Sequence, residues 1–282
     1  MMTQTAPEGE KHFVMTMMEH MDLCAQMGRA FGNDRFESLH PYDEVLYAVA
    51  NHDRGWDDYD QQPIIDPQSG LPFIMAKTPP QEAVKTNKGS PDFNEAHHPY
   101  CGLLSSMHTW GLYNKRYGFS RFTLRIRPGT VSVPVLDVNR VMIDSMLDGE
   151  IKRQQRLKTK LSENPATRAL IEDPQLFQNY KQLQFFDTLS LYFHLYHASE
   201  RGNETYIHVP ISSENDTTVE VRQISDRVYS LDPFPFAGDR LTLVCKGRYT
   251  GPLPAGCNPA QAGALLRALP VDHQTYELVP AR

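Results

Sequence analysis

The sequence predicts a mostly α-helical protein with an inserted β-hairpin and a small β-rich C-terminal part. Before residue 202, several long segments repeat apolar residues at intervals of three and four. Residues 121–135 instead alternate apolar and polar side chains around a Pro-Gly pair, and short alternating runs follow Gly202. We therefore divide the 282 residues into a helical domain, 1–202 with its hairpin near 121–135, and a β-rich subdomain, 203–282, packed on it.

The first two predicted helices each place a histidine on an apolar face. Residues 13–31 form an apolar stripe at helical spacing that includes His20. Pro41 opens the next helix, in which His52 lies on the apolar face. A buried imidazole needs partners for its nitrogens, so each position favours a hydrogen bond or a metal. For His20 alone, a hydrogen-bonded core histidine is the commoner outcome.

Asn51–Asp60, with the sequence NHDRGWDDYD, places a histidine directly before an aspartate. The adjacent side chains of His52 and Asp53 can bind one metal ion. Arg54 could neutralise a phosphate of the substrate, and an ordinary surface arginine is equally compatible with the sequence. The helix should end near Gly55, because the next residues are rich in Asp, Pro and Gly and indicate a covering loop.

Further candidate ligands follow in the middle of the chain. The polar segment 77–94 is typical of a loop, and a helix is expected from about residue 99 to 117. His108 lies on the apolar side of that helix, and His97 and His98 precede it as alternative ligands.

Two long helices are expected after the hairpin. The first spans residues 139–162, and its basic stretch is typical of a solvated face. The second, residues 174–199, is apolar and carries Asp187 on the same face as Ser190 and His194. A charged, unpaired carboxylate in that setting would cost several kcal/mol, so Asp187 requires a cation, hydrogen-bond donors or a raised pKa.

Four separate helices thus each contribute a polar element of metal-ligand type to an apolar interior. Facing helices of a bundle can direct such side chains to one point. The pattern favours a shared metal site over four unrelated buried residues. Its expected ligands are His20, His52, Asp53, His108 and Asp187.

The order of these residues resembles the HD superfamily of metal-dependent phosphohydrolases, in which a histidine, an adjacent His-Asp pair and a later aspartate bind metal. The resemblance is closest to an uncharacterised bacterial family of unknown function with HDxGW, SxH and DxLSL segments. Here these segments are residues 52–56, 106–108 and 187–191. The resemblance implies an HD-type helical bundle and covers about residues 12–200.

The resemblance also implies roles for individual residues. His20, His52, Asp53 and Asp187 would be the primary ligands, Asp53 would bridge two ions, and His108 would bind the second. The expected cofactor is one or two divalent ions, Fe, Mn, Zn, Ni or Co, with Mg also compatible. Asp53 and Arg54 are the expected catalytic residues.

Three functions remain open at this point. The first is hydrolysis of a small phosphorylated metabolite or nucleotide by a metal-activated water. The second is an HD-type diiron oxygenase acting on a small organic substrate, which a further histidine ligand such as His97 or His98 would favour. The third is a non-catalytic metal- or ligand-binding protein.

Composition limits the partners and the compartment. The net charge of −6 argues against general nucleic-acid binding but allows a small anionic substrate. No apolar run reaches the roughly 18 residues that cross a bilayer, so we expect no membrane association and a cytoplasmic protein. The cysteines form no CxxC pair, which predicts reduced, mostly structural thiols. A homodimer is compatible with the sequence.

Overall fold

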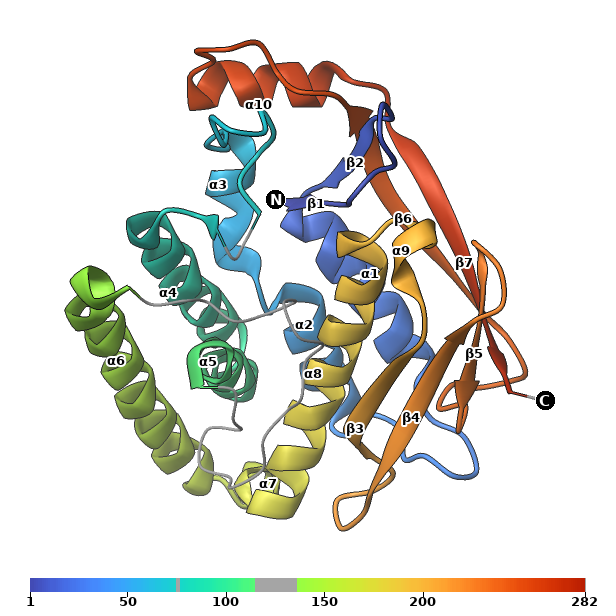
Figure 1. Cartoon of the computed structure of the whole chain (residues 1–282). Coiled ribbons are helices and arrows are strands. Elements are labelled where there is room, and N and C mark those ends of the chain that lie inside the picture. The colour runs from blue at the N-terminus through green and yellow to red at the C-terminus, as the bar shows by residue number, and fades with distance from the viewer. Residues whose placement is uncertain (75–76, 115–135, 282) are drawn as a thin grey trace.

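The computed structural model describes residues 1–74, 77–114 and 136–281. Helices account for about 53% of the described residues and strands for 19%, and the strands form one curled, mixed sheet. Figure 1 shows the sheet curving along one side of the molecule. Helices α1 (Met17–Ala30) and α8 (Asp173–Leu195) pack against its inner face, and α4 (Pro80–His97), α5 (Pro99–Asn114) and α6 (Asp137–Ser162) lie farther from it. The protein is therefore an α+β structure with a substantial sheet.

The sheet has seven strands in the order β1-β2-β6-β7-β5-β4-β3. Neighbouring strands are antiparallel, except that β5 and β7 are parallel, with Val228 opposite Glu277. The strands are β1 (Met2–Thr3), β2 (His12–Met15), β3 (Glu204–Pro210), β4 (Asp216–Gln223), β5 (Val228–Asp232), β6 (Leu241–Thr250) and β7 (Asp272–Pro280).

The predicted fold class, a helical bundle of HD type with a small β-rich C-terminal part, is wrong. Strands from both ends of the chain join in one sheet, where His12 of β2 pairs with Thr250 of β6. β1 and β2 have two and four residues, too few for an alternating pattern to be recognised. The residues that begin the first predicted helix consequently belong to a strand, and Phe13 lies in β2.

The helices of the described residues match the sequence prediction in several places and depart from it in two. Residues 54–61 are helical, and α4 replaces the loop expected over residues 77–94. The hairpin expected near 121–135 lies outside the described residues. The helices are α1 (Met17–Ala30), α2 (Tyr42–Asn51), η1 (Arg54–Trp56), α3 (Asp57–Gln61), α4 (Pro80–His97), α5 (Pro99–Asn114), α6 (Asp137–Ser162), α7 (Pro165–Arg168), η3 (Ala169–Ile171), α8 (Asp173–Leu195), α9 (Ala198–Arg201) and α10 (Pro259–Ala268).

Helix α8 is the central element of the molecule. It packs against β3 and β1 of the sheet, against α1 and α2, and against α5. Every residue from Leu176 to His194 is buried, as expected of a helix with neighbours on all sides. The polar residues of α8 therefore face other elements of the core.

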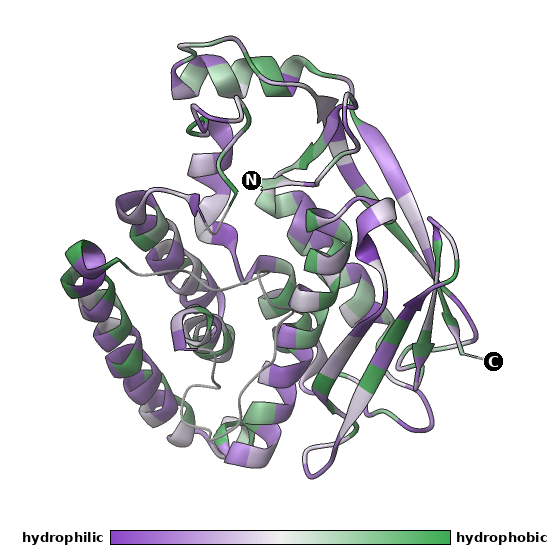
Figure 2. Ribbon diagram, in the orientation of Figure 1, coloured by the Kyte–Doolittle hydropathy of each residue, from purple (hydrophilic) through white to green (hydrophobic). Residues whose placement is uncertain are grey.

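Helix α6 forms the outer edge of the helical part and is largely hydrophilic, as Figure 2 shows. It packs on α5, and Arg153 and Arg156 join it to Glu95 of α4 by ion pairs. Within residues 1–74, 77–114 and 136–281, no helix combines the length and apolar character that a membrane crossing requires.

Candidate metal centre

Helix α1 contributes two neighbouring side chains to the centre. Thr16 caps the helix by accepting a hydrogen bond from the Glu19 amide, and Glu19 accepts one from the Thr16 amide in return. His20 and Cys24 follow one turn apart, so they lie on the same face. Both are fully buried.

The second contribution comes from the corner between α2 and η1, where His52 and Asp53 lie. Asn94 of α4 donates to the carbonyl of Asn51 at 2.7 Å, and Ser105 of α5 donates to the carbonyl of His52 at 3.2 Å. These bonds satisfy carbonyls left free at the end of α2. The adjacent His-Asp pair is thereby held between α4 and α5.

Helices α5 and α8 supply the remaining side chains. His108 of α5 is 1% exposed, and its Nδ1 lies 2.7 Å from the side-chain amide of Gln184 on α8. Asp187 is one turn further along α8 and is also buried. Four helices thus bring their polar residues to one place between α1, α2, α5 and α8.

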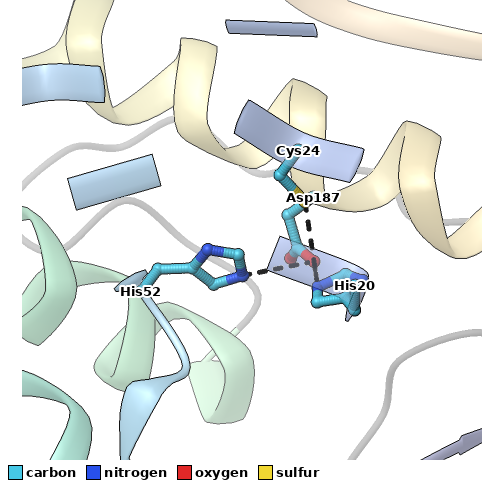
Figure 3. Close-up of side chains that lie close together, drawn as sticks. All are labelled: His20, Cys24, His52 and Asp187. Carbon is cyan, nitrogen blue, oxygen red and sulfur yellow. Dashed lines mark hydrogen bonds and ion pairs between the residues drawn. The ribbon is translucent and has the colours of Figure 1, made fainter. Parts of the chain in front are cut away.

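Histidines and aspartates alternate through the centre. His20 Nε2 lies 3.2 Å from Asp187 Oδ1, and His52 Nε2 lies 3.8 Å from the same oxygen. His52 Nε2 is also 3.7 Å from Asp53 Oδ2, and Asp53 Oδ1 is 3.6 Å from His108 Nε2. Asp53 therefore directs its two oxygens at two different histidines. Figure 3 shows His20 and His52 on either side of the Asp187 carboxylate.

The donor atoms form two overlapping groups in which every atom lies within 4.8 Å of the others. The first contains His20, Cys24, His52 and Asp187, and the second contains His52, Asp53 and His108. His52 belongs to both, but its Nδ1 bonds to the Val49 carbonyl at 2.8 Å and leaves Nε2 alone for a ligand. The two groups are therefore parts of one continuous centre.

The three imidazoles share one orientation, with Nδ1 bonded to the surroundings and Nε2 facing the carboxylates. The Val49 carbonyl can only accept, so Nδ1 of His52 carries the proton and Nε2 has the lone pair when the ring is neutral. Nδ1 of His20 contacts Ser190 Oγ at 2.9 Å. An acceptor for the Nδ1 proton, such as the Val49 carbonyl at His52 or Ser190 Oγ at His20, is typical of histidines that bind metal through Nε2. At His108 the amide nitrogen of Gln184 faces Nδ1, so metal binding through Nε2 of His108 requires the Gln184 amide to turn its oxygen toward Nδ1.

Two of these nitrogens, Nε2 of His52 and Nε2 of His108, have no hydrogen-bond partner among the described residues. Their separations from Asp53 and Asp187 exceed the roughly 2.7–3.2 Å of a hydrogen bond. Ligands that share one ion at bonds of about 2.0–2.2 Å lie roughly 3.3–3.6 Å apart. The observed spacing is thus closer to a coordination shell than to a hydrogen-bond network. An ion would also remove the cost of leaving these nitrogens unpartnered, about 1–3 kcal/mol each.

The charges of the centre favour a cation. Burial alone would lower the pKa of His52, but the carboxylates of Asp53 and Asp187 outweigh burial and raise that pKa to about 9. Burial opposes ionisation of Asp187, yet the neighbouring imidazoles of His20 and His52 hold its pKa well below the usual value. The same carboxylates that stabilise a proton on His52 would attract a metal ion.

The remaining predicted site residues lie outside these groups. Arg54 donates to Met18 Sδ at 2.8 Å, pairs with Asp57 at 3.6 Å and lies over the Phe93 ring, so its assignment to phosphate binding stays a prediction. His97 is exposed and stacks on Tyr47 at 3.5 Å between ring centroids. His98 caps α4 and accepts from the Tyr100 amide. Among the described residues, neither histidine belongs to a ligand group.

Three residues at the centre lie outside the ligand set predicted from the sequence. The sequence predicts Cys24 to be a structural thiol, although its position four residues after His20 places it on the same face as His20. His194 lies 3.1 Å from His20, between the two Nδ1 atoms, and is fully buried. Gln184 contacts His108 as described above. His194 and Gln184 lie on the same face of α8 as Asp187, and this shared face could have identified both residues from the sequence.

Fold and site together define an α+β protein with a buried His/Asp/Cys cluster able to hold metal. The sequence profile of the family described as Protein of unknown function (DUF3891) matches residues 1–250, and the chain belongs to this family. No curated protein and no solved structure matches the chain.

Proposed function

We propose that the protein is a metal-dependent hydrolase that acts on a small phosphorylated metabolite or nucleotide. The observation that carries the proposal is the convergence of three buried Nε2 atoms, from His20, His52 and His108, on Asp53 and Asp187. The order of these residues along the chain resembles that of the HD phosphohydrolases. A divalent ion bound here would lower the pKa of a bound water and polarise a phosphoryl oxygen.

The residues of the chain have separable roles in this proposal. His20, His52, Asp53, His108 and Asp187 would hold one or two ions. Asp53 presents an oxygen to each side and would bridge the two halves of the centre. Val49 and Ser190 offer acceptors to Nδ1 of His52 and His20, and the Gln184 amide would hold His108 in the same way with its oxygen toward Nδ1.

The test is elemental analysis of anaerobically purified protein, with a panel of phosphomonoesters and nucleotides assayed on the same sample. We expect a bound transition metal and turnover of at least one phosphoester. Asp53→Asn should lower metal content and turnover by more than about 100-fold, because it removes a direct ligand. Asp58→Asn is the matched control, because Asp58 is exposed and five residues further along the chain.

Other results would redirect the proposal. Metal-loaded protein that turns over no phosphoester but consumes oxygen with an organic substrate would replace the hydrolase with a diiron oxygenase. Protein that holds no metal, and whose melting temperature is the same with Asn at position 53, would refute the metal centre.

A further inference from the structure

Cys24 differs from the other cysteines of the chain in its surroundings. Its Sγ lies 3.9 Å from His20 Nε2 and belongs to the ligand group with His52 and Asp187, as Figure 3 shows. Cys101 contacts a backbone carbonyl, and Cys245 contacts a methionine sulfur. Among the described residues, Cys24 is the one cysteine placed within a group of potential ligands.

The protein contacts of Cys24 leave its sulfur available to an ion. Sγ lies 3.4 Å from Ser190 Oγ and 3.7 Å from the Phe186 carbonyl oxygen. A thiol has one proton and can donate to only one of these at a time. The sulfur is the donor in both contacts, so neither contact uses its lone pairs, and His20 Nε2 is on the side of the Asp187 carboxylate.

The spacing of the first group fits a tetrahedral shell that includes sulfur. Bonds of about 2.0–2.1 Å to nitrogen or oxygen and 2.3 Å to sulfur give ligand separations of roughly 3.3–3.6 Å. The observed separations are 3.2 Å from His20 Nε2 to Asp187 Oδ1, 3.8 Å from His52 Nε2 to the same oxygen, and 3.9 Å from Cys24 Sγ to His20 Nε2. Three of the six edges are therefore already within a few tenths of an ångström of such a shell.

We propose that Cys24 is a direct ligand and that the centre selects a thiophilic divalent ion, such as zinc, iron(II) or cobalt(II), over magnesium. The inference rests on the metal centre proposed above and narrows the set of ions expected to bind there. Magnesium takes oxygen ligands in an octahedral shell, whereas a Cys-His-His-Asp set suits ions that accept sulfur and nitrogen. Binding breaks the S–H bond of Cys24, forms a metal–sulfur bond and releases the proton to solvent.

Cobalt(II) absorption tests this coordination without reference to activity. Metal-free protein titrated with cobalt(II) should develop visible d–d bands together with a near-ultraviolet thiolate-to-cobalt charge-transfer band. Cys24→Ser should remove the charge-transfer band and lower cobalt(II) affinity by about tenfold or more. Cys101→Ser and Cys245→Ser are the matched controls, because both thiols are buried but lie outside the ligand group, and both variants should keep the band.

X-ray absorption of the zinc-loaded wild-type protein provides a second measurement that needs no variant. It should show one sulfur neighbour at about 2.3 Å beside nitrogen and oxygen neighbours.

Each outcome is decisive. Cobalt d–d bands without charge transfer, and a zinc shell without sulfur, would overturn Cys24 ligation and leave the metal centre standing. Sulfur coordination in a protein that turns over no phosphoester would support Cys24 and refute the hydrolase. Absence of cobalt and zinc binding would overturn both proposals.

Discussion

Gly55, between the His-Asp pair and Trp56, allows the corner at η1 to contact helix α4. A Cβ atom on Gly55 would overlap the Thr86 carbonyl oxygen and would stand 2.5 Å from the Ser90 amide nitrogen and 2.8 Å from the Gly89 carbonyl carbon. All three are backbone atoms, which cannot rotate away. The Gly55 amide also donates a hydrogen bond to Ser90 Oγ at 3.0 Å, so the close contact between Gly55 and α4 helps to fix the position of the corner.

We predict that Gly55→Ala lowers the free energy of unfolding by about 3 kcal/mol, the upper end for overpacking, because the clash is with backbone atoms of α4. For a chain of this size that corresponds to a fall of roughly 6 °C in melting temperature. Metal affinity should fall as well, because Asp53 is two residues away and moves with the corner.

The assay is thermal and urea unfolding of a graded series of glycine variants. Gly89→Ala places its Cβ 3.3 Å from Gly55 Cα and should show a smaller loss. Gly149→Ala has nothing within 4 Å of its Cβ and lies in an exposed position of α6, so it should gain about 0.5–1 kcal/mol. A melting temperature of Gly55→Ala within about 1 °C of wild type would refute the packing argument.

Three further predictions concern charge, ring orientation and metal. Glu95→Gln should cost about 1 kcal/mol at neutral pH. Hydrogen bonds from Arg156 hold the pKa of Glu95 below its usual value, so this difference from wild type should disappear as pH falls through that lowered value. Urea unfolding of both proteins at neutral and acidic pH measures this stability difference. A difference that does not change with pH would contradict the prediction. Gln184→Ala should weaken metal binding about 10- to 100-fold in a chelator competition, because Gln184 contacts the His108 ring. The control Gln155→Ala, on the exposed face of α6, should leave metal affinity unchanged. Equal metal affinities of Gln184→Ala and wild type would contradict the role of the His108 contact. Zinc at about 1,000 times its dissociation constant should stabilise the wild-type protein by about 4 kcal/mol, or roughly 8 °C, and a melting temperature that zinc leaves unchanged would count against the centre.

The residues of the centre could be found from sequence because burial of a polar side chain is costly. His20, His52, His108 and Asp187 each interrupt an apolar helical stripe, and the structure brings them together with Asp53. Cys24 could not be found in this way, because a thiol is common in an apolar core and does not interrupt an apolar helical stripe.

The sheet could be predicted only in part. β4 and β6 show alternation over eight and ten residues, and both lie in segments expected to be strands. β1 and β2 are short, and their place in the sheet depends on β6, which lies more than 200 residues away in the chain. Helix α4 was missed because its polar composition and the internal Pro91 resemble a loop, although Asn94 and Ser90 fasten it to the corner at His52.

The most direct test of the metal centre is anomalous X-ray diffraction from crystals of the metal-loaded protein, measured at the absorption edge of the bound element. We predict an anomalous peak bounded by the Nε2 atoms of His20 and His52 and by the carboxylate of Asp187, with any second peak on the side of Asp53 and His108. Metal-loaded crystals whose anomalous peaks all lie elsewhere, with the imidazoles and carboxylates bonded only to one another, would contradict it.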